Sequence, residues 1–231
     1  MQRRTITTGL ICWGGLCGLS AGTTARAESI SQGDAVLGVR AALERGAASA
    51  VSLLGKSGGF LDNPKVRIPL PGFLNEVAKL AKFTGQQRRV DELVTAMNRA
   101  AEAAVPEAEA LLMSAVKSMS VEDGRKILTG GDNSVTEFFA GKTRAPLRAK
   151  FLPIVTKATE KVSLAEKYNA LAGKAASTGL VKKDDANIQQ YVTRKALDGL
   201  YVMIGEEERK IRRDPIGTGS AILSKVFGSL R

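Results

Sequence analysis

The chain has 231 residues, with 34 Lys and Arg against 23 Asp and Glu, a formal net charge of +11, two Cys and no His. The lack of His excludes His-dependent catalytic triads, His-ligated haem and the Glu-x-x-His motif of di-iron bundles. Both cysteines, Cys12 and Cys17, lie close to the N-terminus, so the rest of the chain has no disulfide and no cysteine metal site. We therefore expect no metal and no cofactor.

The first 27 residues have the pattern of a secretory signal peptide. Arg3 and Arg4 precede an apolar run, and Ala25-Arg26-Ala27 has the small residues of a cleavage site. Cleavage after Ala27 would leave residues 28–231 as one exported domain, which we expect in the periplasm. This mature part has no further apolar stretch long enough to span a bilayer.

Two alternatives concern the export route. A lipoprotein is less well supported, because the bulky residues Ile11 and Leu16 stand before the cysteines, where a small residue is usual. The pair Arg3-Arg4 also allows a twin-arginine signal, although ordinary charge at the start of a signal peptide explains it more simply.

The mature chain begins with a predicted amphipathic helix over 34–54, where apolar residues recur every three or four positions. The segment Gly58–Phe73 follows, and its three prolines exclude a regular helix or a central strand. It is unusually apolar for a loop. One interpretation is a binding loop, with Phe60, Asp62, Asn63 and Ile68 as candidate contacts; the simpler one is a structured connection that plugs the end of a helical core.

The middle of the chain predicts several more helices. A short helix follows Pro71 and ends near Gly85, and a longer one from Gln86 is broken at Pro106 and resumes at Ala108. Possible N-caps, each a hydroxyl with an acid three residues later, then begin three helices at Ser120, Ser134 and Ser163. A separate helical stripe runs from Leu147 to Val162, with Pro153 as a kink.

The longest predicted helix covers 185–214, and the other helices are expected to pack around it. Its apolar residues fall at threes and fours, Asp184 and Asp185 suit its N-terminus, and Asp214-Pro215 ends it. Pairs spaced i,i+4 are expected between Glu206 and Lys210 and between Glu208 and Arg212. With a short helix at 222–227, the pattern predicts an all-α single domain, an irregular bundle of about eight helices with a long C-terminal helix.

Few side chains are left for chemistry. Carboxylates such as Glu102 or Glu206 in a cleft would suit acid–base catalysis, but Glu206–Glu208 are more simply explained as a solvated face paired with basic residues. Asn98, Arg99 and Glu102 predict a buried polar network or a site. Arg194 and Asp198, which lie beside two tyrosines in the sequence, likewise predict either a structural polar network or a site. We name no catalytic residue.

The net charge allows anionic partners. Nucleic acid is not expected, because aromatic residues are only 5% of the chain and are not interleaved with the basic ones. A peripheral membrane binder would need basic residues gathered on one face beside exposed apolar side chains.

Four separated segments together resemble one family. They are Gly58–Pro71 (GGFLDNPKVRIPLP), Met97–Ala108 (MNRAAEAAVPEA), Met119–Leu128 (MSVEDGRKIL) and Tyr191–Pro215 (YVTRKALDGLYVMIGEEERKIRRDP). They are similar, in this order, to the uncharacterised bacterial family DUF4197. The resemblance implies a helical exported domain of Gram-negative bacteria and brings no catalytic residue, ligand or partner.

The expected function is therefore binding without catalysis, to an envelope protein or an anionic envelope component. The alternative is a periplasmic hydrolase-type enzyme that uses carboxylates. The candidate binding residues are Phe60, Asp62, Asn63, Ile68, Asn98, Arg99, Arg194 and Asp198.

Overall fold

The computed structural model describes residues 32–74, 85, 87–160, 162, 165–170, 172 and 186–214. Over these residues the chain forms six α-helices and two short 3-10 helices and contains no strand, which confirms the all-α prediction. The elements are α1 (Gln32–Gly55), η1 (Gly72–Leu74), α3 (Gln87–Ala104), η2 (Val105–Glu107), α4 (Ala108–Lys117), α5 (Val121–Thr129), α6 (Ser134–Thr159) and α8 (Ile188–Arg213). The predicted helix at 222–227, most of the one after Pro71 and the start signal at Ser163 lie outside the described residues.

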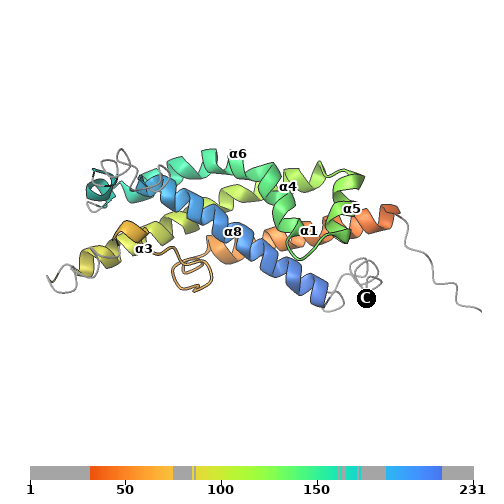
Figure 1. The fold of residues 1–231 in the computed structure, drawn as a ribbon, viewed down its shortest axis with the longest axis horizontal. Coiled ribbons are helices and arrows are strands. Elements are labelled where there is room, and N and C mark those ends of the chain that lie inside the picture. The colour runs from red at the N-terminus through yellow and green to blue at the C-terminus, as the bar shows by residue number, and fades with distance from the viewer. Residues whose placement is uncertain are drawn as a thin grey trace, which may run out of the picture.

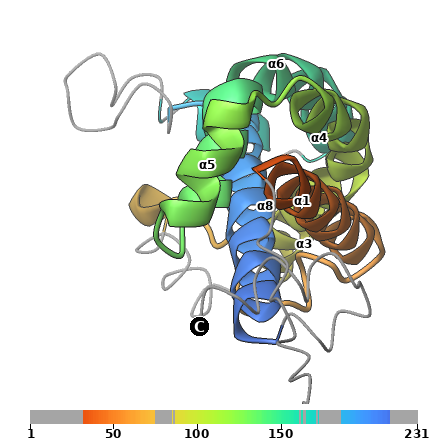
Figure 2. The ribbon, with the colours of Figure 1, turned by 90° about the vertical axis from the view of Figure 1, so that its right-hand side faces the viewer.

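Helix α8 is long, as predicted, and most of its apolar residues are buried. The helix packs against α6, α1 and α3, and it crosses the whole body in Figure 1. Figure 2, along the long axis, shows α8 flanked by α1 on one side and α5 on the other, with α6 above it. A helix with neighbours on several sides buries more than one face, which is why its buried positions exceed a single stripe.

The N-cap of α8 differs from the prediction. Asn187, with an extended backbone, accepts a hydrogen bond from the Gln190 amide at 3.0 Å. An Asn side chain caps a helix as well as an Asp does. The expectation that Asp184 or Asp185 caps this helix is therefore wrong.

The break predicted at Pro106 is confirmed. Helix α3 ends at Ala104, the 3-10 turn η2 contains Pro106, and α4 begins at Ala108. Because Pro has no N–H to donate, the α-helical hydrogen-bond ladder is interrupted there and a 3-10 turn separates α3 from α4.

Helix α6 corrects a second prediction, since one helix of 26 residues replaces the expected two. Pro146 and Pro153 both lie inside it. Its buried residues recur every four positions: Val135, Phe139, Thr143, Leu147, Phe151, Val155 and Thr159. Such a row forms one continuous ridge for packing, and α6 uses it against α8 and α3. Burial along the whole ridge outweighs the two lost backbone hydrogen bonds.

Candidate binding pocket

The predicted loop residues Phe60 and Ile68 lie in the hydrophobic core, as does Val66. This confirms the simpler interpretation of the 58–73 segment, in which its apolar side chains plug the helical core. The two polar residues lie nearer the surface. Asp62 is exposed, and the half-buried Asn63 accepts a hydrogen bond from the Lys65 amide at 3.1 Å.

Helix α3 anchors this segment through two buried polar side chains. Asn98 accepts from the Ile68 amide at 2.8 Å and donates to the Ile68 carbonyl at 3.0 Å. One oxygen of Glu102 accepts from the amides of Phe60 and Leu61, each at 3.0 Å. Asn98 thus forms the predicted buried network.

The second oxygen of Glu102 accepts from the exposed Arg99 at 2.6 Å, and Arg99 also donates to Ser57. Burial pushes the pKa of Glu102 up, but hydrogen bonds from the Leu61 amide, Arg99 and the Phe60 amide outweigh it, so the pKa lies below its ordinary value. Glu102 is therefore an ionised anchor of the loop.

Arg194 and Asp198 belong to a group that joins α8 to α6. Asp198 accepts from Arg144 of α6 at 2.9 Å and lies 3.8 Å from Arg194. The Arg144 guanidinium lies over the Tyr201 ring, 4.8 Å from its centroid, and Arg194 lies over Tyr191. These contacts are half-exposed and hold two helices together.

A pocket of about 400 Å³ opens where α5 gives way to α6. Helix α5 starts with the capping box predicted at Ser120, in which the Ser120 hydroxyl and the Asp123 carboxylate bond each other's backbone amides. The helix ends at Thr129, with Gly130 as its C-cap. A Cβ at Gly130 would lie 2.6 Å from both the Lys126 carbonyl and the Ser134 Cβ, so only Gly allows this turn.

Both polar and apolar side chains line the pocket. Its wall is formed by Asp123, Lys126, Ile127, Gly130, Gly131, Asp132, Asn133, Ser134, Glu137 and Phe138. Three carboxylates face one ammonium group, so the lining is net acidic although the whole chain is strongly basic. Hydrogen bonds from the Ser120 amide and hydroxyl hold the pKa of Asp123 below its ordinary value, so this carboxylate stays ionised.

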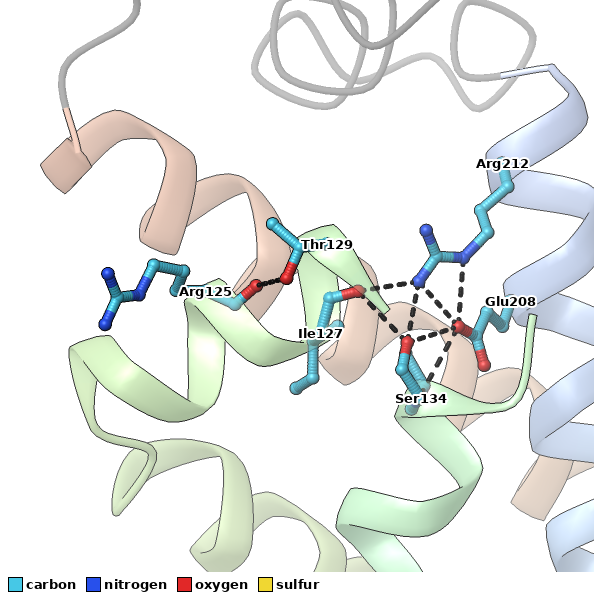
Figure 3. Close-up of polar contacts among 7 residues, drawn as sticks. Arg125, Ile127, Thr129, Ser134, Glu208 and Arg212 are labelled. Atoms are coloured by element: carbon cyan, nitrogen blue, oxygen red, sulfur yellow. Dashed lines mark hydrogen bonds and ion pairs between the residues drawn. The ribbon is translucent and has the colours of Figure 1, made fainter. Parts of the chain in front are cut away.

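Ile127 and Ser134 of the pocket wall also belong to a polar cluster that joins α5, α6 and α8 (Figure 3). Arg212 donates from Nη2 to the Ile127 carbonyl and to Ser134 Oγ, both at 2.8 Å. The same guanidinium binds Glu208 Oε1 through Nε at 3.0 Å and Nη2 at 2.8 Å. Ser134 Oγ lies 3.2 Å from that carboxylate oxygen and 3.0 Å from the Ile127 carbonyl. Arg212 and Glu208 of α8 thus hold the C-terminus of α5 against the N-terminus of α6.

A family model described as a protein of unknown function, DUF4197, matches residues 29–228. The match covers most of the chain and includes all four of the segments that carry the resemblance. This protein belongs to the DUF4197 family.

No curated protein and no solved structure matches the chain. No helix among the described residues of this DUF4197 protein is long and apolar enough to cross a membrane. Within the same residues, no group of three or more Asp, Glu, His or Cys side chains is placed to hold a metal ion.

The acidic run Glu206–Glu208 of the DUF4197 protein differs from the prediction in two ways. Glu206 pairs with Lys65 at 2.6 Å and Arg209 at 2.5 Å, not with Lys210, which instead pairs with Glu207. Lys65 and Arg209 lower the pKa of Glu206 to about 2.

Glu208 is the second difference, because it is buried and does not belong to a solvated face. Its predicted pair with Arg212 is confirmed at 2.8 Å. The i,i+4 spacing predicts such a pair equally well on a buried face and on an exposed one.

Sequence reasoning missed the pocket and the role of Ser134. The hydroxyl of Ser134 was expected to cap α6, but the N-cap is Asn133, whose side chain forms no cap hydrogen bond. The signal was present in the run Gly130-Gly131-Asp132-Asn133, which joins two amphipathic helices with turn residues and a carboxylate. Its length alone did not show that the two helices leave a hollow between them.

Proposed function

We propose that this DUF4197 protein is an exported periplasmic protein that acts by binding, and that the pocket between α5 and α6 holds its ligand. The observation that carries the proposal is a concave site of about 400 Å³ with an apolar part, Ile127 and Phe138, beside converging polar groups. Small-molecule sites in proteins have this size and this mixed lining.

The charges of the lining favour an organic cation with an apolar stem. Asp123, Asp132 and Glu137 outnumber Lys126, which disfavours an anion by like-charge repulsion. Phe138 lines the pocket, and an aromatic ring is a favourable neighbour for an ammonium group or its methylene chain. An envelope protein with an exposed Lys or Arg would present the same chemistry. Binding of an anionic envelope component stays a prediction for other surfaces of this basic chain.

Catalysis by carboxylates has less support than binding. An acid–base pair in a cleft needs pKa values displaced toward neutral pH. Glu208, whose pKa burial raises, does not line the pocket, and Asp123, which does, has a lowered pKa. Glu102 and Glu206 also have lowered pKa values and are held by hydrogen bonds from other residues.

Calorimetric titration of the mature protein with spermidine, an aliphatic polyamine, tests the proposal. We expect a dissociation constant of about 1 mM or lower, weakened at least tenfold by Gly131→Leu. A Cβ at Gly131 would meet nothing within 4 Å and its φ is not positive, so the leucine would enter the pocket without backbone strain. The matched control is Gly141→Leu, because Gly141 is exposed on α6, also has open space at its Cβ and does not line the pocket.

Three results would contradict the ligand assignment. One is no heat with spermidine, and another is equal weakening by both variants. The third is tighter binding of inorganic phosphate or of the neutral disaccharide maltose. Unfolding midpoints of both variants close to that of the parent protein would show that the body is intact.

Export is tested separately by N-terminal sequencing of the protein from the periplasmic fraction. We expect the sequence to begin at Glu28, because cleavage should follow Ala27. Replacing Arg3 and Arg4 with Lys distinguishes the routes, since only a twin-arginine signal needs both arginines. Recovery of an uncleaved chain from the cytoplasm alone would contradict a periplasmic role.

A further inference from the structure

Helix α6 carries a strong positive charge on its outward side. Between Phe138 and Thr159 the sequence has five Lys and Arg and no Asp or Glu. Figures 1 and 2 both show α6 along the upper edge of the body. The five cations are exposed and together form the basic face of α6: Lys142, Arg144, Arg148, Lys150 and Lys157.

The outward side of α6 follows from its buried ridge. Two residues turn an α-helix by about 200°, so the positions midway between successive buried residues point away from the core. These exposed positions form an outward row: Gly141, Ala145, Ala149, Pro153 and Lys157. A Cβ at Gly141 would meet nothing within 4 Å, so the space above the row is open there. The outward row is therefore low and smooth over most of its length.

Cations lie on both sides of the outward row. Arg144 directly follows a buried residue of the ridge and reaches Asp198 of α8 at 2.9 Å. Arg148 has the same place one turn later. Lys150 directly precedes a buried residue, and its Nζ lies 3.7 Å from a carboxylate oxygen of η2. Lys142 has the same place two turns earlier, so one row of cations lies toward α8 and the other lies on the opposite flank.

The neighbouring acids leave the basic face positively charged. Asp198 is shared, because its carboxylate also lies 3.8 Å from Arg194 of α8. Arg144 and Lys150 stay exposed although each has a carboxylate partner. Exposed ion pairs are weak, so a ligand with several negative charges can compete for these two cations.

We propose that the basic face of α6 binds an acidic polysaccharide, laid along the helix over the outward row. From Lys142 to Lys157 the helix rises about 22 Å, so several charged groups of one chain can reach cations on both sides. This surface is separate from the pocket between α5 and α6, and the proposal does not depend on a ligand there.

Two other anionic partners fit the basic face less well. A lipid surface favours large apolar side chains beside the cations, but the exposed large apolar side chains of the described residues lie on α1, α5 and α8: Leu37, Val121 and Val202. A nucleic acid favours aromatic rings on which bases stack, and the outward row has only Gly, Ala, Pro and Lys. A polysaccharide needs neither feature.

Titration of the protein with heparin, a linear sulfated polysaccharide, tests the proposal. We expect the affinity to fall at least about tenfold between about 50 and 200 mM NaCl, because pairing of several charges releases counterions. The triple variant Lys142→Gln, Lys150→Gln, Lys157→Gln loses three of the five cations. It should weaken binding at low salt at least about tenfold and make the salt dependence less steep.

The matched control removes the same total charge from other elements. It is the triple variant Lys56→Gln, Arg89→Gln, Lys210→Gln, in which all three replaced residues are exposed. We expect it to weaken binding less than about threefold, because it lowers the net charge and leaves the basic face intact. Exposed substitutions of this kind change the unfolding midpoint little, so the affinities report on the surface.

Equal weakening by the two triple variants would show that heparin follows the general positive charge of the chain, and it would overturn the proposal. So would the absence of heparin binding at low salt. Tighter binding to oligothymidylate would assign the basic face to a nucleic acid instead, and tighter binding to phosphatidylglycerol vesicles would assign it to a lipid surface.

Discussion

At the scale of single residues, Glu102 holds segment 58–71 to α3. Replacing it with Ala would leave the Phe60 and Leu61 amides without their acceptor and Arg99 without its carboxylate partner. We expect the free energy of unfolding, measured in urea, to fall by about 3 kcal/mol. Glu92→Ala is the control, because its exposed pair with Arg88 should contribute less than about 1 kcal/mol.

The loss in Glu102→Ala should depend on pH. The pKa of Glu102 in the folded protein lies below its ordinary value of 4.5, so the unfolded chain takes up the proton first. The stability from Glu102 is therefore fully present above about pH 4.5 and is lost as the pH falls through the folded-state pKa. A gap between parent and variant that stays constant down to acid pH would contradict this account.

Residue patterns could predict Asn98 as a buried anchor but not the state of Glu208. Asn98 lies beside the apolar stripe of α3, so its burial follows from helical periodicity alone. Glu208 lies among charged residues in the sequence, and its burial depends on the packing of α5 and α6 over α8. That packing joins residues more than seventy positions apart, which no local pattern records.

At the scale of elements, Gly199 determines how closely segment 58–71 approaches α8. A methyl carbon at Gly199 would lie 2.7 Å from Phe60 Cε1 and 3.2 Å from Val66 Cβ. Gly199→Ala should lower the free energy of unfolding by about 1–3 kcal/mol, because overpacking outweighs the better helix propensity. The control is Gly141→Ala, because a Cβ at Gly141 would meet nothing within 4 Å. If both variants raised the midpoint of thermal unfolding equally, Phe60 would not pack against α8 as described.

The sequence predicted where helices form, but it did not predict that one helix continues from Ser134 to Thr159. Capping and breaking residues marked the start of α5 at Ser120 and the break at Pro106 correctly. The same reasoning predicted two helices in place of α6, one from Ser134 and one over Leu147 to Val162 with a kink at Pro153. The buried residues at every fourth position of α6 form a ridge that stabilises the helix as one continuous element. This ridge includes Thr143, whose hydroxyl lies 2.9 Å from the Tyr201 hydroxyl in the core. A polar residue at a buried position interrupts the apolar periodicity, so a search for apolar residues alone does not find the continuous ridge.

At the scale of the whole molecule, α1, α3 and α6 pack against α8, and the junction of α5 and α6 leaves a net acidic hollow on a chain of net charge +11. Composition gives the net positive charge, and periodicity predicted the long helix α8. The hollow depends on the angle between α5 and α6, which the Glu208–Arg212 cluster helps to set (Figure 3). Only tertiary structure therefore places an acidic pocket where the sequence shows a glycine-rich turn.

NMR mapping of spermidine on isotopically labelled protein tests the central claim most directly, because it locates the contact. The account predicts concentration-dependent shifts of backbone amides concentrated at residues 123–138, absent in Gly131→Leu and retained in Gly141→Leu. Shifts at segment 58–71 or along the exposed side of α8, with residues 123–138 unchanged, would contradict it.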